Sequence, residues 1–178
     1  WGVGLLQSAL AVNGSEGLTD FLIELSVRNY DVLFSWWIAQ DDDRPDEHMV
    51  AMNGGDLSLP DRDYYLTDTP AMHAHRTAYL ATVTKVFRLL GTHTNAGAAA
   101  AARRVLSIET RIANITLPRS VARTSTPTYI TTGNLTRWCP HIGWDRFFSA
   151  LNLTHVSDPH AHPARRLGVY DPAYFSEL

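Results

Sequence analysis

The chain has 178 residues, 45% of them hydrophobic, which is enough to build one sizeable core. Its formal net charge of −3 argues against a nucleic-acid partner, because such a partner favours a basic stripe on the protein. The sequence has no apolar run of about 18 residues, so it predicts no membrane-spanning segment. It begins at Trp1 without a charged-then-apolar leader and ends just after a predicted helix start, so we expect a segment of a longer protein.

A helix is predicted after residue 14, because apolar side chains then recur at helical spacing: Leu18, Phe21, Leu22 and Leu25. Ser15 or Thr19 is the expected N-cap, and Tyr30 and Asp31 close the helix. Residues 1–14 are too mixed for a prediction.

Residues 32–52 predict a β-hairpin. The first strand, residues 32–39, is rich in aromatic and branched side chains, and residues 48–52 supply the return strand. The acidic residues 41–47 lack the twelve-residue pattern of a calcium loop, so we expect them to form a solvated hairpin tip. Trp36 and Trp37 are expected on a buried face of the hairpin rather than in a ligand groove.

Residues 57–66, Leu-Ser-Leu-Pro-Asp-Arg-Asp-Tyr-Tyr-Leu, predict a rigid corner between a sheet-like region and the helices that follow. Pro60 fixes its own φ and biases Leu59 away from the helical region. Asp61 is expected to cap a helix that starts just after it. We expect Arg62 to lie at a packed junction, where a carboxylate distant in sequence would hold it in a two-pronged pair.

Two further helices are expected after this stretch. Pro70 suits a first helical turn, and apolar residues then recur at helical spacing until Gly91, which is placed for a left-handed cap. Asn95 is expected to cap the second helix, which ends at residues 116–118. Its alanine run, residues 98–102, would let the two helices pair closely as an antiparallel hairpin.

The C-terminal third predicts short elements joined by loops. Residues 117–133 and 155–166 are expected to be loops, and residues 134–138 a short helix. A compact apolar face follows that helix: Trp144, Phe147, Phe148 and Leu151. Residues 167–170 predict a short strand, after which Asp171 caps a helix with Pro172 at its first position.

Four Asn-x-Ser/Thr sequons indicate a secreted or extracellular chain: Asn13, Asn114, Asn134 and Asn152. The same residue types also cap helices, and the two interpretations are compatible. Cys139 is the one cysteine of the sequence, so it is either a buried thiol or pairs with a cysteine outside this chain.

Residues 57–66 resemble the signature in the N-terminal domain of the neprilysin and endothelin-converting-enzyme family of zinc metallopeptidases. The residues that carry this structural signature are Leu59, Pro60, Arg62, Asp63, Tyr64 and Tyr65. The family usually has a glycine where this chain has Asp56, and we expect Gly54 and Gly55 to supply the flexible backbone instead.

Other elements resemble the same family in the same order. Glu109-Thr-Arg-Ile-Ala113 is similar to its Glu-x-x-Leu-Ala element, and Asp171-Pro-Ala-Tyr-Phe175 to its Asp-Pro-x-Tyr-Phe element. Glu109 has no partner acid, base or metal-ligand spacing. We therefore expect a structural role for it, solvated or paired with an arginine such as Arg119 or Arg123.

The sequence shows no catalytic or metal-binding motif. It lacks the His-Glu-x-x-His helix that such a zinc enzyme needs, and it has no Gly-x-Ser-x-Gly elbow and no phosphate loop. His73 and His75 would point apart on a helix, and His160 and His162 lie among prolines, so surface histidines are the better interpretation.

The resemblance implies a fold that is mainly α with a small β-hairpin, with residues 1–178 forming part of the helical cap lobe of a two-lobed metallopeptidase. The zinc ligands would lie in a C-terminal catalytic lobe absent from this chain. The parent would be a single-span plasma-membrane or secreted enzyme that cuts peptides, with this stretch helping to cap the cavity. The alternative is a non-catalytic extracellular binding protein that kept this domain and lost the zinc lobe.

Overall fold

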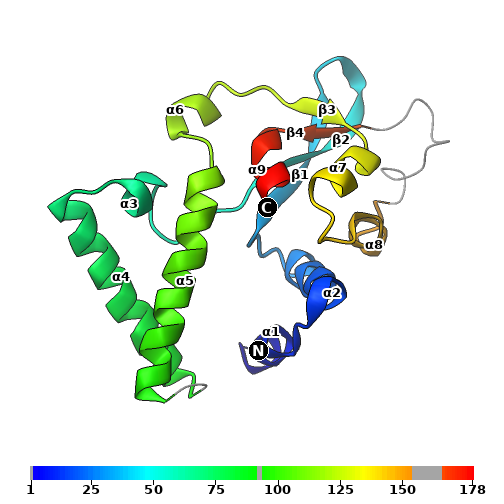
Figure 1. Cartoon of the computed structure of the whole chain (residues 1–178). Coiled ribbons are helices and arrows are strands. Elements are labelled where there is room, and N and C mark those ends of the chain that lie inside the picture. The colour runs from blue at the N-terminus through cyan, green and yellow to red at the C-terminus, as the bar shows by residue number, and fades with distance from the viewer. Residues whose placement is uncertain (1, 92–93, 154–165) are drawn as a thin grey trace. The chain divides into compact units, whose positions relative to one another are not determined.

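The computed structural model describes residues 2–91, 94–153 and 166–178 (Figure 1). The chain divides into two compact units. Unit 1 combines Trp1–Asp56 with Ala122–Leu178, and unit 2 is Leu57–Val121. The expectation of a mainly helical fold with a small sheet is confirmed.

Unit 1 holds a four-stranded sheet with the order β1-β2-β4-β3. Strands β1 (Phe34–Asp41) and β2 (Arg44–Gly54) form the predicted antiparallel hairpin. Strand β4 (Leu167–Val169), also predicted, pairs parallel to β2 and antiparallel to β3 (Thr128–Ile130). Because β2 is a central strand, its residues 49–52 are buried.

The core of unit 1 is an aromatic cluster beside this sheet. The largest fully buried side chains include four of its members, which come from α8 and α9: Trp144, Phe147, Tyr174 and Phe175. The ring of Phe34 on β1 joins them, with its centroid 5.1 Å from that of Trp144. The predicted apolar face is therefore confirmed at three positions, while Leu151 is only half-buried.

The helices of unit 1 begin close to their predicted positions but not always at the predicted caps. Helix α1 (Gly2–Ala11) occupies residues for which the sequence made no prediction. Helix α2 (Gly14–Val27) starts after Asn13, not after Ser15 or Thr19. The hydroxyl of Thr19 instead donates a hydrogen bond to the Ser15 carbonyl within the helix.

Residues 117–133 are not the continuous loop that was predicted. They contain α6 (Arg119–Ala122), β3 and the start of α7 (Thr132–Trp138). The Ser-, Thr- and Pro-rich composition hid these elements because a three-residue strand carries too little pattern. Helix α8 (Trp144–Ala150) carries the predicted apolar face. Helix α9 (Pro172–Glu177) begins as predicted, and the Asp171 carboxylate accepts from the Tyr174 amide as an N-cap.

Unit 2 consists mainly of α3 (Asp63–Leu66), α4 (Pro70–Leu89) and α5 (Asn95–Ile115). Figure 1 shows α4 and α5 as the predicted antiparallel pair. Helix α3 lies between the N-terminal end of α4 and the C-terminal end of α5. Ala98 and Ala102 are fully buried, so the alanine run does allow close approach. The N-cap of α5 is Thr94 rather than Asn95, because the Thr94 hydroxyl accepts from the Gly97 amide.

Gly54 and Gly55 serve close packing, not the backbone freedom that was expected of them. A Cβ on Gly55 would lie 2.4 Å from the Val32 carbonyl oxygen. One on Gly54 would lie 2.9 Å from Cδ2 of Tyr174. Both glycines are therefore required by their neighbours, whatever the residue at position 56.

Candidate functional site

Two polar networks stand out among the described residues, each built around one carboxylate. The first lies in unit 1 at the tip of the β1–β2 hairpin. The pairing register of the hairpin shifts between Gln40 and Asp41, and such an irregularity re-aims a side chain. Asp41 ends β1 with a side chain only 1% exposed, so the predicted solvated tip is wrong at this residue.

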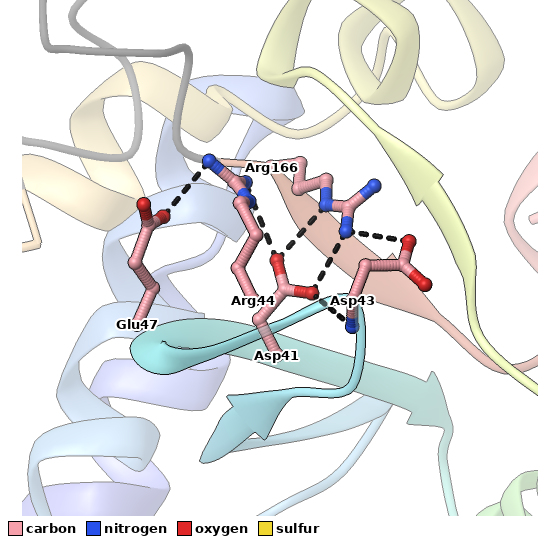
Figure 2. A network of polar contacts seen from close by, with 5 residues as sticks. All are labelled: Asp41, Asp43, Arg44, Glu47 and Arg166. Carbon is pink, nitrogen blue, oxygen red and sulfur yellow. Dashed lines mark hydrogen bonds and ion pairs between the residues drawn. The ribbon is translucent and has the colours of Figure 1, made fainter.

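Arg166 holds Asp41 through a two-pronged ion pair (Figure 2). Its Nε donates to Oδ2 of Asp41 at 2.9 Å, and its Nη2 donates to Oδ1 at 2.8 Å. The same Nη2 lies 2.7 Å from Oδ2 of Asp43, on the turn of the hairpin. A planar guanidinium matches a carboxylate in this arrangement, so the contact is both strong and directional.

Four further contacts belong to this network. Arg44 bridges Asp41, at 3.3 Å, and Glu47, at 2.8 Å. The backbone amide of Asp43 donates to Oδ1 of Asp41 at 3.0 Å. The guanidinium carbon of Arg166 lies 3.7 Å from the centroid of the Tyr129 ring on β3, a cation–π contact. The network therefore ties β3 and the start of β4 to the hairpin.

The electrostatics follow from these contacts. The hydrogen bonds from Arg166 hold the pKa of the Asp41 carboxyl well below its usual range, although burial opposes this. The pKa of the Arg166 guanidinium is raised in turn by its hydrogen bonds to Asp41. Burial raises the pKa of the Tyr129 hydroxyl, and the negative charge of Asp43 adds to that effect.

The second network lies in unit 2 and joins the signature residues 57–66 to α5. Glu109 accepts hydrogen bonds from the hydroxyls of Ser58 and Tyr65, the latter at 3.2 Å. The Tyr65 hydroxyl also accepts from the Leu59 amide at 2.8 Å, and Tyr79 on α4 bonds to Glu109 as well. The partners of Glu109 among the described residues are therefore hydroxyls, and not the expected Arg119 or Arg123.

Burial of the two tyrosines changes their acidity. Tyr65 is 5% exposed, and this burial, together with the Glu109 charge, raises the pKa of its hydroxyl well above the usual value. Burial also raises the pKa of Tyr79 to about 12, and its hydrogen bond to Glu109 contributes to the shift. Both phenols therefore remain neutral donors to the carboxylate at physiological pH.

Two arginines from outside the signature satisfy its backbone. Arg76 on α4 donates to the carbonyls of Tyr64, at 2.8 Å, and Thr67, at 3.0 Å, at the C-terminal end of α3. Arg119 donates to the Pro60 carbonyl at 3.0 Å and lies 3.4 Å from a carboxylate oxygen of Asp61. Together with the hydrogen bond from the Leu59 amide to the Tyr65 hydroxyl, these arginine contacts hold the backbone of the stretch in place.

The other signature residues, Asp61 to Tyr64, differ in how far they are buried and in what they contact. Asp61 accepts from the Asp63 amide at 3.4 Å, so it supports the start of α3 only weakly as a cap. Asp63 is exposed, and the Tyr64 ring lies against His75 with centroids 5.1 Å apart. Arg62 is half-buried, and the expected carboxylate partner is not among the described residues.

Three of the four sequon asparagines are exposed: Asn13, Asn114 and Asn152. Asn134 is half-buried, because its side chain accepts from the Thr131 amide and hydroxyl in a capping box.

Cys139 is 2% exposed, and burial raises the pKa of its thiol, so it is an inert core group here.

The histidine pairs do not form a metal site in the part of the chain that is described. His73 is exposed and pairs with Asp68, while His160 and His162 lie outside the described residues. Within residues 2–91, 94–153 and 166–178, no group of three or more His, Cys, Asp or Glu side chains is placed to hold a metal ion. No helix in these ranges is long and apolar enough to cross a bilayer.

Sequence reasoning missed Arg166, Tyr129, Arg76 and the hydroxyl of Tyr79. Arg166 was placed in a loop, and it lies 125 positions from Asp41, so no local pattern could pair the two. Trp37 was also misjudged, since it is 40% exposed and stacks on Tyr170 with ring centroids 5.5 Å apart. Residues 34 and 37 point to opposite faces of a strand, so a buried Phe34 could have indicated that Trp37 lies on the other face.

Comparison with known proteins gives a consistent result. A family model described as "Peptidase family M13" matches residues 4–178. The chain is 31% identical to Neprilysin-3 of Drosophila melanogaster over 155 residues, 84% of this chain and 19% of that protein. It is 27% identical to human endothelin-converting enzyme 1 over 147 residues, 82% of this chain and 18% of that enzyme.

Solved structures share the fold. A Mycobacterium tuberculosis zinc metalloprotease in complex with inhibitor matches 97% of this chain with a TM-score of 0.80 at 19% identity. PEPO from Lactobacillus rhamnosis matches 95% with a TM-score of 0.72 at 15% identity. The chain spans 25% and 26% of those two chains, and about a fifth of the curated relatives.

Proposed function

Because the chain belongs to peptidase family M13, we propose that it is the N-terminal part of an extracellular zinc metalloendopeptidase that processes peptides. In this proposal the stretch helps to cap the substrate cavity, and peptide cleavage takes place in a C-terminal lobe outside residues 1–178. The observation that carries the proposal is the family match over residues 4–178. Relatives about five times as long leave room for that lobe.

The described residues of this chain do not fit a catalytic zinc ion. The described part offers no suitable ligand cluster, and the sequence has no His-Glu-x-x-His helix. The carboxylates at the centres of the two networks, Asp41 and Glu109, are engaged by arginines and hydroxyls. Any zinc of the parent enzyme would therefore take its ligands from another part of the polypeptide.

The cap role is supported by the character of unit 2. It is helical, and none of the described α4 side chains is buried. Apolar side chains at the C-terminal end of α4 remain exposed, among them Val86, Leu89 and Leu90. A helical hairpin with an uncovered apolar end suits contact with a further part of a larger protein.

The complete gene and the complete protein provide the test. We expect a downstream His-Glu-x-x-His helix followed by a glutamate ligand, and chelator-sensitive cleavage of a hydrophobic reporter peptide by the complete protein. Residues 1–178 alone should neither cleave the peptide nor bind catalytic zinc. A complete protein without those ligands would instead support the extracellular binding protein, and cleavage by residues 1–178 alone would overturn the proposal.

The extracellular setting rests on the sequons, and glycan analysis tests it. Asn114 on α5 and Asn152 after α8 are exposed, so both acceptor amides are within reach of a transferase. In a secretory host we expect a glycan on each, seen as a mass loss on glycosidase treatment that Asn114→Gln and Asn152→Gln each reduce. An unchanged mass would contradict this part of the proposal.

A further inference from the structure

Arg62 differs from the two arginines that stabilise the signature residues 57–66. Arg76 donates hydrogen bonds to backbone carbonyls at the end of α3, and Arg119 binds Asp61 and the Pro60 carbonyl. Arg62 receives none of these acceptors. Arg76 and Arg119 therefore already bind these backbone carbonyls and Asp61, without any contribution from Arg62.

The guanidinium of Arg62 lacks an acceptor among the described residues. Its Nε is buried and makes no hydrogen bond, and no ion pair joins Arg62 to a described carboxylate. A guanidinium cannot shed its charge in a protein, and a buried donor without an acceptor is costly. This position is therefore unfavourable unless an acceptor arrives from elsewhere.

The backbone that carries Arg62 is held in place on both sides. Tyr65, one helical turn further on, is fixed by its hydrogen bonds with Leu59 and Glu109. The Arg62 carbonyl accepts from the amides of Tyr65, at 3.0 Å, and Leu66, at 3.2 Å. The Arg62 guanidinium is therefore attached to a fixed backbone, which lowers the entropy lost when it binds an acceptor.

We propose that Arg62 is a docking residue that receives a carboxylate side chain from a part of the same polypeptide outside residues 1–178. This rests on the proposed function, in which the relatives' greater length corresponds to a further lobe. A carboxylate fits because it accepts two parallel N–H bonds from a guanidinium and balances its charge. The nearest carboxylates in sequence do not serve, because Asp61 pairs with Arg119 and Asp63 is exposed to solvent.

Amide hydrogen exchange of the complete protein, without added peptide, tests this docking contact. The variants are Arg62→Met, which keeps the length but removes the donors, and the matched control Arg119→Met. We expect Arg62→Met to raise exchange at least about tenfold both in residues 57–66 and in one segment outside residues 1–178, where it strands the partner carboxylate. Arg119→Met should raise exchange within unit 2 only, because both of its acceptors lie there.

Other outcomes overturn the docking contact. An Arg62→Met effect confined to residues 57–121, or no effect, would mean that no outside carboxylate binds here. A change that appears only when a peptide is added would assign the site to a substrate carboxylate instead. Arg62→Lys keeps the charge and gives a folded comparison, with a smaller rise in both segments. Peptidase activity is measured separately. An inactive protein in which Arg62→Met still raises exchange in both segments would contradict the proposed function but support this contact.

Discussion

The two carboxylate networks differ in how they compensate a charge. Asp41 in unit 1 is 1% exposed and is neutralised by arginines, one of which comes from 125 positions away. Glu109 in unit 2 is half-buried, and its known partners are the neutral hydroxyls of serine and tyrosine. The first network therefore depends on paired charges and the second on oriented dipoles.

This difference predicts different responses to damage. Removing one partner of a buried ion pair leaves the other charge buried with neither a counter-ion nor water to compensate it, which is costly. A half-buried carboxylate that loses one hydroxyl can turn to water. The two units should also fail at opposite ends of the pH scale, because the pKa of Asp41 is lowered while those of Tyr65 and Tyr79 are raised.

The largest effect is expected for Arg166→Ala. It removes both prongs from a carboxylate that is 1% exposed, so unit 1 should lose roughly 3–5 kcal/mol of stability. Urea unfolding followed by tryptophan fluorescence measures this, because Trp37 and Trp144 both lie in unit 1. Arg137→Ala, an exposed arginine of the same unit, is the control and should cost under about 1 kcal/mol. Equal losses for the two variants would show that Asp41 is adequately solvated without Arg166.

Glu109→Ala should have the next largest effect, about 1.5–3 kcal/mol, the range for hydrogen bonds to a charged group. It leaves the hydroxyls of Ser58, Tyr65 and Tyr79 without their shared acceptor. Unit 2 contains no tryptophan, so amide exchange across α5 is the suitable measurement. Glu109→Gln keeps one acceptor oxygen and should lie between wild type and alanine. If glutamine proved as damaging as alanine, the charge itself would be essential and the contrast with Asp41 would disappear.

The elements of both units were largely predictable, whereas the networks were predictable only in part. Pro70, Gly91 and Asp171 act locally, through φ restriction, a left-handed cap and an N-cap, so neighbouring residues reveal them. The motifs that hold Tyr65 and Glu109 stood out in the sequence, but the hydrogen bond between them was not predicted. The Asp41–Arg166 pair was not visible at all, because it depends on β4 lying beside the hairpin.

Local rules also failed where two residues compete for one role. Thr94 and Asn95 are both good N-caps, and only the hydrogen bond from Gly97 to Thr94 decides between them. The sequence predicted a distant carboxylate for Arg62 but could not say which one, and it did not reveal that the adjacent Asp61 pairs with Arg119. Long-range packing resolves such choices, and a single sequence does not record it.

Acid should destabilise unit 1 through Asp41. Its folded pKa is lowered, so its contribution to stability is present above the unfolded pKa and is lost as pH falls toward the folded pKa. We expect a loss of roughly 2 kcal/mol below about pH 4, followed by tryptophan fluorescence. Asp41→Asn should start from a lower stability but lose less of it in this range. A parallel acid profile for the variant would place the acid-sensitive group elsewhere in unit 1.

The smallest effect, and the one that separates the units most clearly, is expected in base. Tyr79 titrates near 10 when unfolded and at about 12 in the folded unit, so the unfolded chain loses this proton first as pH rises. The contribution of Tyr79 is therefore complete below pH 10 and declines between pH 10 and 12. Tyr79→Phe should cost about 1 kcal/mol or less at neutral pH, the value of one hydrogen bond, and should weaken the alkaline decline seen by exchange in α5. Tyr65 adds a second phenol with a raised pKa, so part of the decline should persist. An alkaline decline of unit 1 as steep as that of unit 2 would remove the distinction between a network of charges and a network of hydroxyls.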